Sequence, residues 1–198
     1  MLAVCLGCNR ASATASGPPI GPYGDFNPST APPAAAQLTM AGVSFPVTLK
    51  VNTADGGELR IVAIQDAKAV DQEVYQDDGA TFSLAHAGGE NFKPPIPLLN
   101  FPMHIGDTWD WAGSTTMDTS AQAARASIRT AVSRTMIDGN PENSVEVDID
   151  LEMGINSPSP MRRQLKFWFV KGKGIVRRSF GEESIREPLD SKRKEESR

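Results

Sequence analysis

The chain has little cysteine, no long hydrophobic run and no excess of basic charge, and each absence excludes a class of protein. Its two cysteines, Cys5 and Cys8, lie at the extreme N-terminus, so no disulfide framework holds the rest of the chain. The sequence contains no run of about 18 apolar residues, so it predicts no transmembrane helix. The net charge of -4 argues against a nucleic-acid-binding protein, which needs a basic face, and against a polybasic membrane-surface binder.

The sequence also lacks the signatures of common enzymes and metal sites. Gly-x-Ser-x-Gly, His-Glu-x-x-His and phosphate-loop motifs do not occur. His86 and His104 are the only histidines, and a catalytic triad or a zinc site would need one of them beside a nucleophile or beside two further ligands. We therefore predict no cofactor, no metal ion and no enzymatic activity. A hydrolase with an unrecognised site is kept as a lower-ranked alternative.

The first eight residues end in a short motif that suggests where the protein works. Leu6-Gly7-Cys8 resembles the C-terminal end of a bacterial lipoprotein signal peptide, which is cleaved before a Cys whose thiol then carries a diacylglycerol. The resemblance implies a protein lipidated on Cys8 and anchored to a membrane of the bacterial cell envelope, facing the periplasm or the exterior. A signal peptide needs a charged start and an apolar core of about 7–15 residues, for which residues 1–7 are too short. Either translation starts upstream, or the match is accidental and the segment is a disordered tail.

Two other interpretations of Cys5-x-x-Cys8 are weaker. A thioredoxin-like redox motif should follow a strand and open a helix, whereas this pair precedes a stretch rich in Ser, Ala and Pro. A zinc site would need two more ligands, and no further cysteine exists.

Composition divides the chain into four parts. Residues 1–8 would be the remnant of the signal peptide that the Leu6-Gly7-Cys8 resemblance implies, and residues 9–36 are rich in Ala, Pro, Ser and Gly. Such a segment buries too little apolar surface to offset its ordering entropy, so we predict a disordered linker. Residues 37–189 have the composition of one folded domain, and the tail 190–198 is almost entirely charged.

Short β-like runs separated by turn residues fill residues 37–189. The clearest is 145–155, where Val, Ile, Leu and Met alternate strictly with carboxylates. A period of two puts the apolar side chains on one face and the carboxylates on the other, as in an antiparallel sheet with one wet face. The run 66–75 also fits a helical stripe, and we favour a strand. We predict an all-β fold: a curved antiparallel sheet or a half-open barrel or sandwich.

The acidic face of this strand has two interpretations. The preceding run, 123–137, places Arg125 and Arg129 at the same period, and the turn residues 138–141 make the two runs a long hairpin. Arginines would then pair with carboxylates across the outer face. A calcium site is less well supported, because a straight strand spreads alternate carboxylates almost 7 Å apart and calcium needs six to eight converging oxygens.

A proline-rich apolar segment, residues 90–103, is the strongest candidate for a ligand site. Its prolines argue against a central strand and favour a segment across the open edge or mouth of the sheet. Core or lid packing is the simpler explanation of the tryptophans that follow it. The alternative is an apolar groove for a lipid or peptide, lined by Phe92, Leu98, Leu99, Phe101, Trp109 and Trp111.

An ordered set of motifs resembles uncharacterised bacterial envelope lipoproteins with an all-β domain. The set comprises Leu98-Leu99-x-Phe101-Pro102-Met103, then Gly106-Asp107-x-Trp109-x-Trp111, then Trp168-Phe169-Val170-x-Gly172-x-Gly174-Ile175-Val176. The resemblance covers roughly residues 40–189 and implies a curved antiparallel sheet on a lipoprotein. Its motifs form a strand entrance and a glycine hairpin, and they imply no reaction.

Three functions remain in order of preference. The first is a non-enzymatic, lipid-anchored envelope protein that acts as a structural or binding module for an envelope partner. The second is a carrier that shelters a lipid or acyl chain in a half-barrel groove. The third is the hydrolase noted above.

Overall fold

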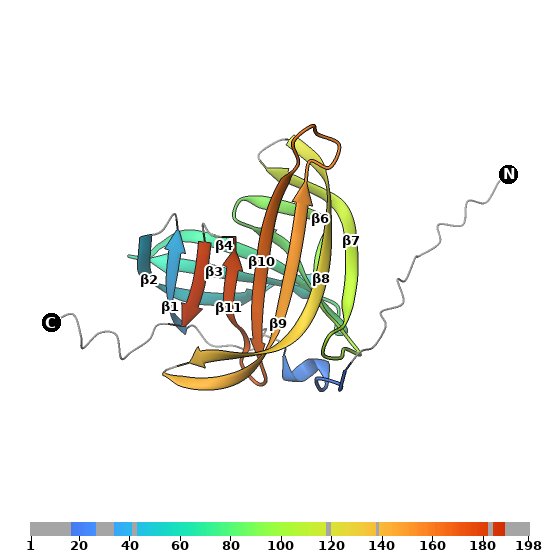
Figure 1. The fold of residues 1–198 in the computed structure, drawn as a ribbon. Coiled ribbons are helices and arrows are strands. Elements are labelled where there is room, and N and C mark those ends of the chain that lie inside the picture. The colour runs from blue at the N-terminus through green and yellow to red at the C-terminus, as the bar shows by residue number, and fades with distance from the viewer. Residues whose placement is uncertain are drawn as a thin grey trace.

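A computed structural model describes residues 17–26, 34–40, 43–117, 120–137, 139–181 and 184–188. Within these residues the chain is almost entirely strand, as Figure 1 shows. The strands are β1 (Ala34–Met40), β2 (Val43–Thr53), β3 (Glu58–Gln65), β4 (Lys68–Asp77), β5 (Thr81–Ala87), β6 (Glu90–Asn100), β7 (Thr108–Met117), β8 (Ser120–Ile137), β9 (Asn140–Met153), β10 (Met161–Val170), β11 (Gly174–Phe180) and β12 (Ser184–Pro188).

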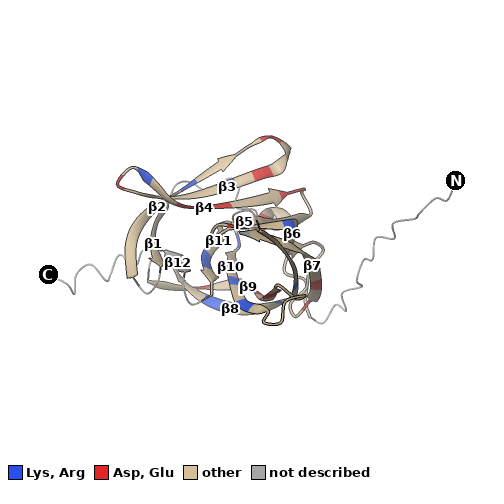
Figure 2. Cartoon of the chain, turned by 90° about the horizontal axis from the view of Figure 1, so that it is seen from above, with Lys and Arg blue, Asp and Glu red and all other residues tan. Residues whose placement is uncertain are grey.

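All the strands belong to one strongly curled antiparallel sheet. From β2 to β12 each strand pairs with the next one along the chain, and β1 pairs with both β2 and β12, so the strand order closes into a barrel. Viewed from above, the strands run round a ring, and charged positions are coloured on its β8–β10 side (Figure 2). The predicted all-β fold with a curved antiparallel sheet is confirmed, and so is the strand assignment of residues 68–75.

The alternating pattern of residues 145–153 holds on the apolar face, whereas on the carboxylate face Asp148 is buried beside Arg129 and Lys166. Val147, Ile149 and Leu151 on β9 are buried, whereas Asp150 is exposed. Their inward side chains join one apolar core that draws on β3 to β11, and a smaller cluster of Ala36, Leu38, Val47 and Ala63 fills the β1–β3 side. No helix among the described residues has the length and apolar character needed to span a bilayer.

The proline-rich segment is a strand, which corrects the prediction that it lies across an edge or mouth. Residues 90–100 form β6 between β5 and β7. The ladder to β7 stops at the pair Lys93↔Ser114, and Pro94, Pro95 and Pro97 come only after it. A proline lacks an N–H, so a sheet tolerates it where a neighbouring ladder has ended.

Part of the segment expected to be a disordered linker is folded onto the domain. Ile20 N–H donates to the carbonyl of Met103, and Gly172 N–H donates to that of Asp25. Phe26 is buried against the main core. Residues 17–26 therefore differ from the linker prediction, and β1 begins at residue 34 rather than after residue 36. Residues 1–16 and 27–33, and the tail 190–198, lie outside the described residues.

Candidate functional site

The outer face of β7–β10 holds a groove with a volume of about 1180 Å³. Charged and apolar residues both line it, and we call it the polar groove after its charged side chains. The strand register brings its polar side chains together in rows that run across the four strands. One row joins Asp110, Ser127, Asp150 and Gln164. The next row joins Ala112, Arg125, Glu152 and Arg162. The groove is therefore built by the pairing of four strands and not by any one segment.

Two arginines pair with the Glu152 carboxylate in the groove. Arg125 Nη2 lies 2.5 Å from Glu152 Oε2, and Arg162 Nη2 lies 3.3 Å from Glu152 Oε1. The hydrogen bond from Arg125 lowers the pKa of the Glu152 carboxyl, and the charges of both arginines act in the same direction. Glu152 therefore stays ionised below the pH at which a free glutamate is protonated.

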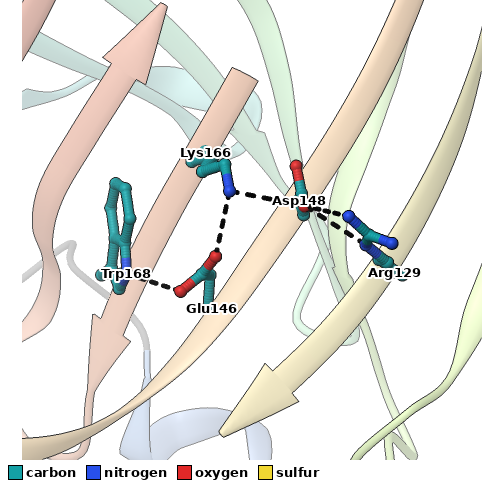
Figure 3. A network of polar contacts seen from close by, with 5 residues as sticks. All are labelled: Arg129, Glu146, Asp148, Lys166 and Trp168. Atoms are coloured by element: carbon teal, nitrogen blue, oxygen red, sulfur yellow. Dashed lines mark hydrogen bonds and ion pairs between the residues drawn. The ribbon is translucent and has the colours of Figure 1, made fainter. Parts of the chain in front are cut away.

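A second network continues along the same face beyond the groove (Figure 3). Arg129 Nη2 lies 2.6 Å from Asp148 Oδ2, and Lys166 Nζ lies 3.5 Å from Glu146 and 3.6 Å from Asp148. Trp168 Nε1 donates to Glu146 at 3.0 Å. The predicted pairing of arginines with carboxylates on this hairpin is confirmed at both Arg125 and Arg129.

These contacts pair acidic side chains of the outer face with basic ones. Among the described residues no group of three or more His, Cys, Asp or Glu side chains could hold a metal ion. Charges that are already paired can still accept hydrogen bonds from a partner, but they do not form the converging oxygen shell that calcium needs. The arrangement is suited to recognising a polar surface.

A separate ionic group lies inside the barrel and was not predicted from the sequence. The guanidinium of Arg178 on β11 lies 2.8 Å from the Glu73 carboxylate on β4, and both side chains are buried. Tyr75 Oη donates to the same carboxylate at 2.7 Å. Burial lowers the pKa of Arg178 and raises that of Tyr75. The only sequence signal was that Glu73 and Arg178 share their strand faces with Tyr75 and Phe180.

The six residues predicted to line an apolar groove lie together at the β6–β7 wall. Five of them are buried in the main core, and Phe101 packs against it half-buried. Trp109 Nε1 donates to the carbonyl of Pro97 at 3.1 Å, and Trp111 Nε1 donates to that of Pro94 at 3.0 Å. We call this region, where tryptophan side chains replace the backbone ladder, the β6–β7 seam. Only Trp111 of the six also borders the polar groove.

Gly113 permits the close approach of the two strands at the start of the seam. A Cβ atom at this position would lie 2.5 Å from the carbonyl oxygen of Lys93 and 2.6 Å from Cζ2 of Trp111. The glycine is therefore part of what lets the indole reach Pro94.

The other residues singled out by sequence have local partners or lie outside the described residues. His86 Nδ1 lies 3.0 Å from Asn91 Oδ1, and His104 Nδ1 lies 3.6 Å from Asp107 Oδ2. Cys8 is outside the described residues, so its lipidation stays a prediction. The glycine hairpin of the motif set joins β10 to β11, and the two tryptophans of its first part lie on β7.

No protein-family model matches the chain, and no curated protein matches it. Three solved structures are similar to it, and each likeness covers 81% of this chain. One is described as a "putative lipoprotein" from Parabacteroides distasonis, with a TM-score of 0.48, 11% identity and 94% of its own length covered. A second is a "putative exported protein with YmcC-like fold" from Bacteroides fragilis, with a TM-score of 0.45, 13% identity and 95% covered.

The third is the hypothetical lipoprotein YmcC from Escherichia coli, with a TM-score of 0.45, 11% identity and 87% of its length covered. Identities of 11–13% and TM-scores below 0.5 describe a distant likeness. No function passes from these proteins to this chain on that basis.

Proposed function

We propose that this chain is a non-enzymatic protein of the bacterial envelope, anchored by a lipid on Cys8, that binds an envelope partner through the polar groove. The anchor is supported by the Leu6-Gly7-Cys8 motif. The single observation that carries the binding role is the groove, because it combines about 1180 Å³ of space with paired charges of both signs. Paired charges give specificity more than affinity, which suits a partner with a polar surface.

The anchor is tested by labelling with a fatty acid. The gene, with its upstream codons, is expressed in a bacterial host that takes up the label, next to Cys8→Ala and Cys5→Ala variants. We expect label and membrane association in the parent and in Cys5→Ala, and neither in Cys8→Ala. Label that persists in Cys8→Ala would refute the anchor at this residue.

The groove is tested by cross-linking in living cells. A photo-reactive residue at Ser127, which lines the groove, is compared with one at Thr48, which is exposed on β2 and does not line the groove. We expect a discrete cross-linked species from position 127 only, and we expect it to disappear in the double charge reversal Arg125→Glu with Arg162→Glu. The same products from both positions would argue against a binding role for the groove.

A carrier of an apolar ligand is the second candidate, and the β6–β7 seam favours it. Backbone pairing stops at Lys93, and beyond it the wall is closed by Trp109 and Trp111. Side chains can rotate without breaking a ladder, so this wall offers a route to an apolar interior. Phe92, Leu98, Leu99 and Phe101 would then contact the ligand.

Tryptophan fluorescence tests the carrier. Trp168→Phe removes the emission of the outer face, and the unlipidated Cys8→Ser chain is titrated with fatty acids and detergents. A shift in emission that is lost in Trp109→Phe or Trp111→Phe would support a ligand at the seam. A folded chain whose emission does not change at any ligand concentration would refute it.

A further inference from the structure

The end of the β8–β9 hairpin leaves the barrel as a two-stranded arm. β7 pairs with β8 no further than Arg129, and β10 pairs with β9 no further than Val145. Beyond these points, the described residues 131–137 and 140–144 form ladders only with each other. We call these residues the arm; in Figure 1 it curls beneath the barrel at the bottom of the view.

The arm has one buried face and one exposed apolar face. Thr135 Oγ1 and Ser144 Oγ lie 3.0 Å apart and are buried. Val132, Arg134 and Met136 occupy every second position and therefore point to the opposite side. Val132 is 63% exposed and Met136 is 58% exposed, which places them among the most exposed large apolar side chains of the described residues. Arg134 lies between them and is also exposed.

The chain enters the domain at the base of this arm. Ile105 N–H donates to the carbonyl of Pro18, and the next residue, Gly106, donates to that of Thr130, where the arm begins. Lys173 in the β10–β11 turn pairs with Glu142 on the arm, and Gly172 in the same turn donates to Asp25. The arm, the β10–β11 turn and residues 17–26 therefore form one end of the barrel (Figure 1).

The length of chain between Cys8 and Gly17 limits how far this end can stand from a membrane. Only residues 9–16 separate them, and an extended chain spans at most about 3.5 Å per residue. A lipid on Cys8 would thus hold Gly17, and with it the base of the arm, within about 30 Å of the bilayer.

We propose that the exposed face of the arm docks on the bilayer that anchors Cys8. This inference rests on the proposed lipid anchor. Val132 and Met136 would enter the interface between headgroups and acyl chains, and Arg134 would bind lipid phosphate while its stem lies along the apolar side chains. The short connection favours the membrane over a second copy of the chain, because it keeps this end of the barrel within about 30 Å of the bilayer.

The test couples the full chain to vesicles without relying on cellular lipidation. Cys5→Ser leaves Cys8 as the single cysteine, which reacts with a maleimide lipid in vesicles of phosphatidylethanolamine and phosphatidylglycerol. Amide hydrogen exchange is then compared between the coupled and the free chain. We expect exchange in peptides covering residues 131–144 to slow several-fold on coupling.

A matched pair of double variants separates the arm from exposed apolar residues in general. Val132→Ser with Met136→Ser should abolish the protection. Met40→Ser with Val43→Ser should retain it, because these side chains are 41% and 65% exposed at the β1–β2 turn, at the opposite end of the barrel. Equal protection in the two double variants, or no protection in the coupled chain, would overturn the proposal.

Protection that appears without vesicles and rises with protein concentration would also overturn it, in favour of a second copy. The lipid anchor itself is tested by a different experiment, the fatty-acid labelling in cells. A chain that takes up no fatty acid on Cys8 in cells refutes the anchor, whereas the vesicle experiment reports on the arm alone.

Discussion

Strands β8, β9 and β10 carry two different surfaces whose residues alternate along the same backbone. On the inside, Leu151 and its cross-strand partner Ala126 are buried in the apolar core. On the outside, the adjacent residue Glu152 meets Arg125 and Arg162. The inner surface gains stability from dry packing, while the outer surface carries paired charges whose arginines are exposed to water. The comparison teaches that one wall can be dry on its inner side and carry a charged face on its outer side.

Placing a charge on the inner face of the sheet should cause the largest loss of unfolding free energy. Leu151→Asp removes packing and buries an unpaired carboxylate, so we expect a loss of about 5 kcal/mol of unfolding free energy. Asp150→Asn changes the next residue, on the wet side, and should stay within about 0.5 kcal/mol. Denaturant unfolding of both variants checks this. Similar losses at the two positions would mean that both faces are dry.

Breaking the internal ion pair of Arg178 and Glu73 should cause the second-largest loss of unfolding free energy. Arg178→Met leaves Glu73 charged and buried, which costs about 3–5 kcal/mol. Adding Glu73→Gln removes that charge and keeps an acceptor for Tyr75, so the double variant should recover part of the loss. Thermal or denaturant unfolding of the full double-mutant cycle measures the coupling. Additive losses would show that the pair does not act as a unit.

Adding a methyl group at the start of the β6–β7 seam should cause an intermediate loss of unfolding free energy. Gly113→Ala forces its Cβ against Lys93 and Trp111, and overpacking of this kind costs about 1–3 kcal/mol. Gly24→Ala is the matched control, since nothing lies within 4 Å of the Cβ it would add. Stability and tryptophan emission are both measured. Equal stability of the two variants would mean that β6 and β7 are not closely packed at Gly113.

Removing an outer ion pair should change the unfolding free energy least, and this change should depend on pH. The pKa of Glu152 is lower in the folded chain than in the unfolded one. Its contribution to stability is therefore present above about pH 4.3 and is lost as the pH falls through the lower folded value. Arg125→Gln should destabilise slightly at neutral pH and converge with the parent in acid.

Lys68→Gln removes the same charge from the exposed start of β4, away from Glu152. Unfolding free energies of the parent and both variants across this pH range give the comparison. A deficit of Arg125→Gln that stayed constant in acid would separate its effect from the ionisation of Glu152.

Local patterns were sufficient to predict most of the strands. The alternation of residues 145–153 and the glycine hairpin at residues 171–174 are set by neighbours in sequence. The prolines of β6 led to a wrong prediction, because a strand tolerates proline where a neighbouring ladder has ended. Where the ladder to β7 ends is a property of the whole sheet. The same limit applies to residues 17–26, whose partners include residues in the distant β10–β11 turn.

The candidate site was harder to predict than the fold. Arginine–carboxylate pairing could be predicted from one hairpin, but the groove also needs β7 and β10 in register with it. Glu73 and Arg178 lie 105 residues apart and meet only when the barrel closes. The sequence places Trp109 and Trp111 on one strand face, yet no sequence pattern shows that their indole N–H groups donate to proline carbonyls.

The intact mass of the membrane-bound chain tests the central claim, a lipid anchor at Cys8, most directly. The gene with its upstream codons is expressed in a bacterial host, and the protein is extracted from membranes with detergent and weighed. The account predicts a chain that begins at Cys8 and carries the added mass of a diacylglycerol. A chain that retains residues 1–7, or one with an unmodified Cys8 thiol, would contradict it.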